Sequence, residues 1–176
     1  KLENLVIASP DVGGSKRASS YAKYLDCPLV LCNKTRERAN VVATMQIIGD
    51  VEGKDVIIVD DMISSGGSLL DVATQLKKVY GAKRVFNFAT FGLFTDGFDA
   101  FDEAYEKGII DKIVTTNLVY RKPEILKKPW YVEVNMAKYV SYIIDTLNHD
   151  TTISNLLDPN ARIAKLLEKH RAELAE

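Results

Sequence analysis

The residues best suited to chemistry lie in one stretch, VIIVDDMISSGGS, which occupies residues 56–68. Four apolar residues predict a buried strand, two carboxylates follow it, and the Ser/Gly segment 64–68 leads into a helical pattern. Glycines let the backbone approach an anion closely, and the N–H groups at a helix start point toward that anion. Serine hydroxyls add further hydrogen-bond donors. The stretch therefore predicts a loop that binds a phosphomonoester.

The two carboxylates, Asp60 and Asp61, need a different ligand group, because a phosphate beside them would be repelled. Ribose hydroxyls donate hydrogen bonds and are natural partners for carboxylates. The ends of strands in open α/β sheets are also where ligand sites lie. The plainer alternative is an ordinary strand–turn–helix junction with Ser68 as the N-cap of the helix. A Walker loop is excluded, because no Gly-Lys-Ser/Thr follows.

A parallel sheet is needed to position these residues, and the chain alternates apolar runs with amphipathic segments as such sheets do. We expect an α/β fold with helices on both faces of the sheet and a C-terminal helical tail. The predicted strands are 5–9, 28–32, 45–49, 56–59, 84–90, 112–116 and, at an edge, 131–134. The predicted helices are 16–25, 69–80, 99–107, 136–147 and a last one that opens at 158, with a polar loop at 33–40.

Composition restricts the class of protein. The 176 residues include 23 Lys+Arg and 24 Asp+Glu, a net charge of −1, which argues against a bulk nucleic-acid or acidic-membrane binder. The length suits one domain, since domains commonly have about 100–150 residues. No apolar run reaches the roughly 18 residues of a transmembrane helix. Only Cys27 and Cys32 are present, so no disulfide framework is expected and a cytoplasmic location is predicted.

The stretch 56–68 resembles the phosphoribosyl-pyrophosphate loop shared by type I phosphoribosyltransferases and ribose-phosphate pyrophosphokinases. Two further stretches, SPDVGGSKRA (9–18) and NKTRERANVVATMQIIGDVEGKDVIIVDDM (33–62), resemble the C-terminal domain of the pyrophosphokinases, in the same order and with nearly gapless spacing. The resemblance is close over about 4–92 and looser beyond, although NHDTTISNLL (148–157) is similar to that family's ending.

The resemblance implies a phosphoribosyltransferase-like fold and a magnesium-dependent transfer of the diphosphoryl group of ATP to the 1-hydroxyl of ribose 5-phosphate. Lys34 and Arg36 match catalytic cations of a mobile loop that closes over the nucleotide phosphates. Asp11 matches an aspartate associated with magnesium and the ribose, and Asp60 and Asp61 match the carboxylates that hold the ribose hydroxyls. The residues that match the 5-phosphate loop are Ser64, Ser65, Gly66, Gly67 and Ser68.

Plainer roles stay open for some of these residues: Lys34 and Arg36 as solvated loop cations, and Asp11 as a turn former before two glycines. One position departs from the family pattern. The family usually has Asp-Thr where this chain has Ser64-Ser65, and a threonine at the position of Ser68. The hydroxyls are kept, but one carboxylate is lost from the sugar site, which also reduces repulsion of the phosphate.

The resemblance also implies a domain organisation: a C-terminal phosphoribosyltransferase-like domain at 1–157, a helix at 158–176, and a family N-terminal domain that is not in this chain. That domain shares the ATP site and supplies a magnesium-binding histidine, which neither His149 nor His170 matches. We therefore expect this chain alone to bind ribose 5-phosphate weakly and to be inactive.

The family forms homodimers that assemble into hexamers, so the resemblance implies a homo-oligomer. Two alternatives of different classes stay open. One is a non-catalytic regulatory protein that keeps this fold, which Ser64 favours slightly and the Lys34-x-Arg36 pair disfavours. The other is a type I phosphoribosyltransferase, which would use the same loop to bind phosphoribosyl pyrophosphate but would need a hood for a base.

Overall fold

The computed structural model describes residues 2–35 and 44–173. Its contacts divide the chain into two compact units, Lys1–Val134 and Asn135–Glu176, which are described separately. The first unit contains the candidate site. The domain boundary predicted after residue 157 stays a prediction.

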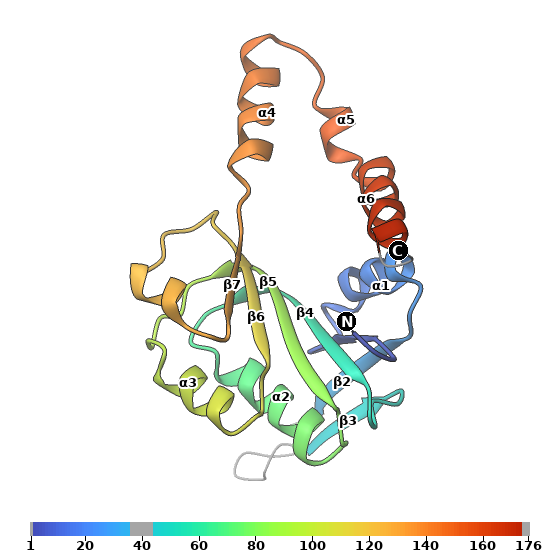
Figure 1. The fold of residues 1–176 in the computed structure, drawn as a ribbon, viewed down its shortest axis with the longest axis vertical. Helices are drawn as coiled ribbons and strands as arrows, with labels where there is room; N and C mark the ends of the chain where they lie inside the picture. Colours follow the sequence, from blue (N-terminus) through green and yellow to red (C-terminus); the bar gives the residue numbers. More distant parts are fainter. Residues whose placement is uncertain (1, 36–43, 174–176) are drawn as a thin grey trace. The chain divides into compact units, whose positions relative to one another are not determined.

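The first unit is built on a sheet whose described strands follow the order β3-β2-β1-β4-β5-β6-β7 (Figure 1). Neighbouring strands are parallel, except that β2 and β3 are antiparallel. The strands are β1 Val6–Ser9, β2 Leu29–Thr35, β3 Thr44–Ile48, β4 Asp55–Ile63, β5 Arg84–Gly92, β6 Lys112–Thr116 and β7 Tyr131–Val134. The predicted parallel α/β fold is confirmed.

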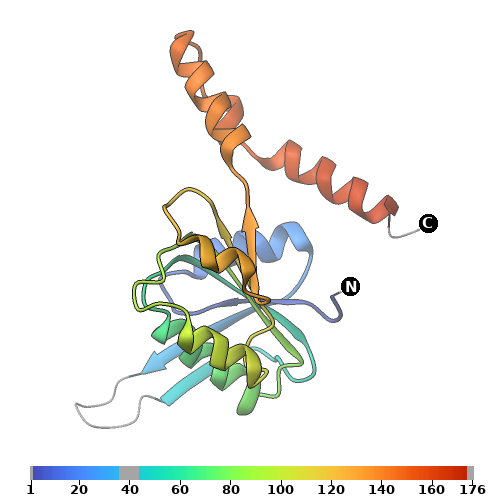
Figure 2. The ribbon, with the colours of Figure 1, turned by 60° about the vertical axis from the view of Figure 1, so that its left-hand side comes forward.

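Helices cover both faces of this sheet, as the apolar run in β4 predicts. Alternate residues of a strand point to opposite faces. Ile57 and Val59 pack with α1 (Ser15–Leu25) on one face. Val56 and Ile58 belong to the larger core cluster on the other face, together with side chains of α2 and α3. Figure 2 shows these two helices on the opposite side of the sheet from α1. These helices and a short 3-10 helix have the bounds α2 Gly67–Lys78, α3 Asp99–Glu106 and η1 Pro123–Lys127.

The second unit is helical: α4 Ala137–Asn148 and α6 Asn160–Glu173 correspond to the two helices that the sequence predicts here, and the short α5 Ser154–Leu157 is not among the predicted elements. The Tyr139 hydroxyl donates to the Leu156 carbonyl at 2.6 Å, which ties α4 to α5. No described side chain of α4 or α6 is fully buried. Among residues 2–35 and 44–173, no helix combines the length and the apolar composition needed to cross a membrane.

The polar loop predicted at 33–40 is partly wrong. Residues 33–35 continue β2, where Asn33 pairs with Gln46 and Thr35 with Thr44 of β3. The strand continues because the buried Cys32 and Met45 anchor the two-stranded ribbon, which polarity alone does not reveal. The rest of the predicted loop, 36–40, lies outside the described residues.

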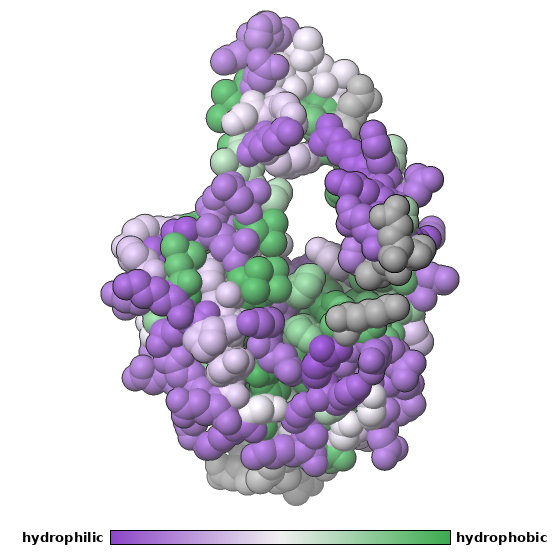
Figure 3. Space-filling model, viewed as in Figure 1, coloured by the Kyte–Doolittle hydropathy of each residue, from purple (hydrophilic) through white to green (hydrophobic). Residues whose placement is uncertain are grey.

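Exposed apolar side chains gather near the carboxyl ends of the strands, where Met62, Leu93 and Leu118 are all exposed. Figure 3 shows apolar residues reaching the surface of the viewed face between hydrophilic ones. Such residues do not contribute to the core of this unit. The core instead lies between the sheet and its helices, where Trp130 and Phe101 are among the largest fully buried side chains.

A buried ion pair joins the starts of β4 and β5. The Asp55 side chain is 0% exposed, accepts a hydrogen bond from Arg84 Nε at 2.8 Å, and also accepts the N–H of Glu3 at 2.5 Å. The hydrogen bond from Arg84 lowers the pKa of Asp55 below its ordinary value. The stabilising contribution is therefore complete above the unfolded-state value of about 4 and is lost as the pH falls through the folded-state value.

Replacing Asp55 with alanine is expected to lower the free energy of unfolding by about 3 kcal/mol, because the substitution removes the carboxylate that Arg84 and the N–H of Glu3 share. Urea unfolding at pH 7 measures this loss. The matched control is Asp50→Ala, which removes an exposed carboxylate 2.7 Å from Lys54 and should leave the urea midpoint close to that of the wild type. Equal losses in the two variants would contradict the assignment.

Candidate functional site

The predicted phosphate loop is the turn between β4 and the N-terminus of α2. Gly66 is the N-cap residue, with φ at 92°, and the first helical hydrogen bond runs from the Leu70 N–H to the Gly66 carbonyl at 2.9 Å. No side chain caps this helix end, so the earlier N–H groups are open to an anion. Ser68 is the second residue of α2, and the alternative that it caps the helix is wrong.

The two glycines of the loop have different roles. A Cβ atom at Gly66 would lie 2.1 Å from Cζ of Phe101, and the positive φ of Gly66 is also unfavourable for other residues. A Cβ atom at Gly67 would meet only Ser65 Oγ, at 3.9 Å. Gly66 is therefore needed for packing, whereas Gly67 keeps the outer surface of the loop open.

The segment that follows β5 holds the loop in place. The Leu93 N–H donates to the Ile63 carbonyl at 2.8 Å, and the Thr95 N–H donates to the Ser64 carbonyl at 3.1 Å. These bonds continue the pairing of β4 with β5 beyond the last register pair, Ile63 with Gly92. The exposed serine side chains of the loop therefore extend from a backbone that these hydrogen bonds hold in place.

Asp60 and Asp61 form an acidic pair at the end of β4 together with Arg17 of α1. The Asp60 side chain is 27% exposed and that of Asp61 is 65% exposed. Arg17 Nη1 lies 3.5 Å from Asp60 Oδ1, and Arg17 Nη2 lies 3.3 Å from Asp61 Oδ2. The Asp61 N–H also donates to Asp60 Oδ1 at 2.8 Å. One guanidinium thus offsets the repulsion between the two carboxylates.

The two carboxyls titrate differently. Burial raises the pKa of Asp60, and the side chain of Asp61 raises it further, whereas the hydrogen bond from the Asp61 N–H and the charge of Arg17 oppose this rise. The hydrogen bond from Asp60 lowers the pKa of Asp61. As the pH falls, Asp60 therefore takes up a proton first, and its protonated oxygen is then a donor rather than an acceptor for a sugar hydroxyl.

Asp11 lies in the turn after β1, the strand next to β4. Its Oδ1 accepts the N–H of Gly14 at 2.7 Å, and its carbonyl accepts the Ser9 hydroxyl at 2.7 Å, so the turn-forming role is real. The described residues contain no group of three or more His, Cys, Asp or Glu that could hold a metal. A single exposed carboxylate fits Mg²⁺ only where substrate phosphates supply further ligands, which is common for this ion.

The structure does not test the two predicted catalytic cations. Lys34 belongs to β2, with Met45 of β3 as its register partner. Arg36 lies outside the described residues. The strand order brings the other predicted residues to one edge, since β1 and β4 are parallel neighbours whose carboxyl ends meet there.

Sequence reasoning missed Arg17. It lies in the first turn of α1, 43 positions before Asp60, and only the adjacency of β1 and β4 brings the two together. The available signal was its place soon after Gly13-Gly14, at the start of the helix that follows β1. That position indicates a contact with the acidic pair only once β1 is known to be the neighbour of β4.

Comparisons with known proteins show which family the chain resembles. Residues 1–94 match the family model described as phosphoribosyl transferase domain. A ribose-phosphate pyrophosphokinase of Shewanella oneidensis is 42% identical over 155 residues, which cover 88% of this chain and 48% of that protein. One of Porphyromonas gingivalis is 50% identical over 95 residues, covering 54% and 30%.

A solved structure leads to the same family. The crystal structure of phosphoribosylpyrophosphate synthetase from Mycobacterium smegmatis superposes with a TM-score of 0.72 at 27% identity, covering 84% of this chain and 46% of that one. The chain thus spans about half the length of the curated relatives that it matches over most of its residues. The resemblance drawn from the three sequence stretches is confirmed.

The ion pairs of Arg17 are testable without any ligand. Arg17→Met should raise the pKa of Asp60, because it removes the cation that favours the ionised carboxylate. Carboxyl ¹³C shifts followed by NMR across a pH titration measure this change. Lys16→Met, which removes an exposed cation one residue earlier, is the matched control. An unchanged Asp60 titration in Arg17→Met would show that the pairing does not persist in solution.

Proposed function

The chain belongs to the phosphoribosyl transferase domain family, and we propose that it is the sugar-phosphate-binding half of a ribose-phosphate pyrophosphokinase. The observation that carries the proposal is the uncapped N-terminus of α2, which directly follows the acidic pair of β4. One end of this site attracts an anion, and the other accepts hydrogen bonds from hydroxyls. Ribose 5-phosphate carries both kinds of group in one small molecule.

In the proposed complex, the 5-phosphate lies at 64–68 and accepts hydrogen bonds from backbone N–H groups and serine hydroxyls. Asp60 and Asp61 accept hydrogen bonds from the ribose hydroxyls, and the charge of Arg17 favours the ionised form of both carboxylates. Binding the sugar at both ends fixes the direction of its 1-hydroxyl. Such positioning is a large part of catalysis in phosphoryl transfer.

The proposed reaction transfers the diphosphoryl group of ATP. The oxygen of the ribose 1-hydroxyl forms a bond to the β-phosphorus, the bond from that phosphorus to the α,β-bridging oxygen breaks, and AMP leaves. The proton of the hydroxyl is released to solvent. Lys34 and Arg36 are proposed to neutralise the negative charge that develops on the transferring group. Mg²⁺ bound by Asp11 and substrate oxygens would neutralise further phosphate charge.

The remaining half of the relatives' length is proposed to complete the ATP site and to take part in a homo-oligomer. The exposed Met62, Leu93 and Leu118 beside the candidate site are consistent with further protein covering this edge. Ser64 leaves one carboxylate fewer at the sugar than the family pattern has. We therefore expect sugar binding to depend on Asp60 and Asp61.

Gly67→Val should weaken the binding of ribose 5-phosphate at least roughly tenfold, because a branched side chain would cover the N–H groups at the start of α2. Isothermal titration calorimetry of the chain measures this affinity. Because a Cβ at Gly67 has room, the fold should be kept, and Gly67→Ala should have a smaller effect. Ser20→Val, a β-branched change at an exposed position of α1, is the control. Unaltered affinity in Gly67→Val would contradict the proposed phosphate site.

The catalytic proposal is tested in a protein that carries this chain together with the other half found in its relatives. Lys34→Ala and Arg36→Ala should each lower kcat for AMP formation by about 10²–10³, since each removes charge stabilisation from the transition state, while ribose 5-phosphate affinity is kept. Arg38→Ala, which changes a nearby cation with no assigned role, is the control.

The same assay separates the alternatives. Ribose 5-phosphate binding without any AMP formation by the wild-type protein would identify a regulatory protein. Base-dependent release of pyrophosphate from phosphoribosyl pyrophosphate would identify a phosphoribosyltransferase.

A further inference from the structure

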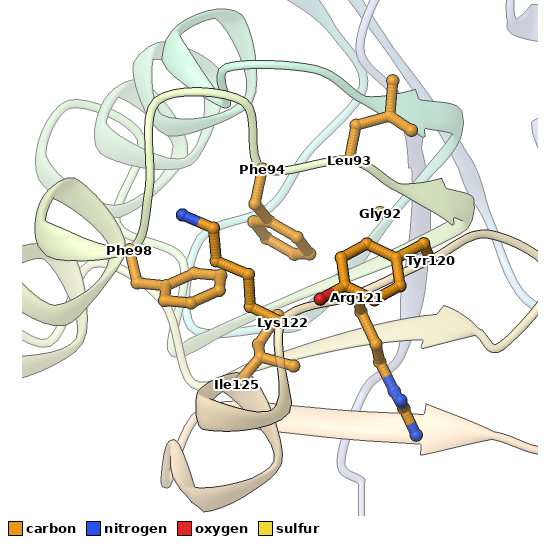
Figure 4. Close-up of a pocket in the computed structure, with 8 residues that line it drawn as sticks. All are labelled: Gly92, Leu93, Phe94, Phe98, Tyr120, Arg121, Lys122 and Ile125. Atoms are coloured by element: carbon orange, nitrogen blue, oxygen red, sulfur yellow. The ribbon is translucent and has the colours of Figure 1, made fainter.

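A cavity of about 90 Å³ lies beside the end of β5, and it is lined by none of the residues proposed to bind the sugar phosphate (Figure 4). Phe94, Phe98 and Ile125 form its apolar walls, and Tyr120 and Lys122 stand at its mouth. Figure 4 shows the two phenylalanine rings, the stem of Lys122 and the Tyr120 ring around one space. The cavity is therefore built from two segments, 92–98 and 120–125, that follow neighbouring strands.

The walls suit one aromatic ring. The rings of Phe94 and Phe98 meet edge to face with centroids 5.7 Å apart, and Ile125 is fully buried behind them. A third ring could join them in the offset or edge-to-face arrangements that aromatic groups prefer. Pockets for drug-sized ligands have about 300–1,000 Å³, so this cavity holds only one ring of a ligand.

Phe94 adopts an unusual backbone conformation at this wall. Its φ is 48°, in the left-handed region that bulky side chains rarely occupy. The ring is held by Phe101 and Trp130, with centroids 5.1 and 5.9 Å away. Strained residues of this kind persist where their surroundings fix them, and they concentrate at ligand sites.

The mouth of the cavity favours an anion. Arg121 lines the cavity, but its guanidinium turns away from the other lining side chains and binds Glu133, with Nη2 2.8 Å from Oε1 (Figure 4). Its charge is thus largely balanced by that carboxylate. The exposed Lys122 contributes an ammonium group, and beside it the Tyr120 side chain, 83% exposed, offers a hydroxyl. A ring that packs against the two phenylalanines inside the cavity would bring its substituent close to this ammonium group.

We propose that this cavity binds a small aryl anion, whose ring packs against Phe94 and Phe98 and whose carboxylate or phosphate meets Lys122. The second part of the proposal rests on the proposed function: occupation of the cavity changes the affinity of the loop 64–68 for sugar phosphate. The path from the cavity to the loop is short. Phe94 lies between Leu93 and Thr95, the two residues whose N–H groups donate to the carbonyls at the start of that loop.

Benzoate is the first probe, because it carries a carboxylate and lacks the phosphate group that the loop 64–68 is proposed to bind. Phenyl phosphate is the second probe. The single tryptophan, Trp130, is fully buried with its ring 6.3 Å from that of Phe98, so its fluorescence reports occupation of the cavity. A saturable change in emission is expected with benzoate, and a much weaker one with neutral benzamide. Equal responses to benzoate and benzamide, or none to either, would overturn the proposal.

Lys122→Gln should weaken benzoate binding roughly tenfold by removing the charged partner. The matched control is Lys127→Gln, an exposed cation of η1 that does not line the cavity, which should bind benzoate as the wild type does. Equal losses of benzoate affinity in both variants would mean that only the overall charge of this surface matters, and this would overturn the proposed site. Unaltered emission of both variants without ligand verifies that they are folded.

Calorimetry with ribose 5-phosphate at saturating benzoate tests the coupling. The affinity should change several-fold, and ribose 5-phosphate must change benzoate affinity by the same factor. No change in either affinity would overturn the coupling. Benzoate binding without any ribose 5-phosphate binding would overturn the proposed function while the aryl-anion cavity stands.

Discussion

The site depends on one constraint, which is that β1, β4 and β5 run parallel and end at the same edge of the sheet. Residues of β4 are buried on both faces, so a slip of one position would turn its apolar side chains toward the wrong helices. The fixed register of β4 against its neighbours then determines the positions of the turns that follow these strands. Asp11, the acidic pair and the glycine loop are therefore placed by the sheet, and the hydrogen bonds from Leu93 and Thr95 complete the support.

Positive and negative charge occupy different positions at this edge, only a few residues apart. The first turn of α2 contains no acidic side chain, which leaves the positive end of the helix to an external anion. The carboxylates instead lie on the preceding strand, where Arg17 reduces their mutual repulsion. This division of charge suits the proposed ligand, which has a phosphate at one end and hydroxyl groups at the other. The helix start and the acidic pair are thus the two parts of the proposed binding site.

Local sequence signals predicted most of this arrangement. The apolar run in β4, the Asp60–Asp61 pair and the glycines identified the sheet, its edge and the loop, because each feature is encoded within a few neighbouring residues. Arg17 was missed because its contacts depend on strand order, which the local pattern does not contain. Residues 33–35 were predicted as loop because they are polar, although pairing with β3 keeps them extended.

The shape of the glycine loop is set by the hydrophobic core as much as by its own residues. Gly66 packs against the ring of Phe101, and that ring lies 5.1 Å from Phe94 and 5.4 Å from Trp130. Trp130 in turn donates its indole N–H to Asp102 at 2.7 Å, which fixes it against α3. The ring of Phe101 therefore leaves no room for a side chain at Gly66, where the helix begins. The proposed phosphate loop and the core therefore share a packing contact, although their residues lie far apart in the sequence.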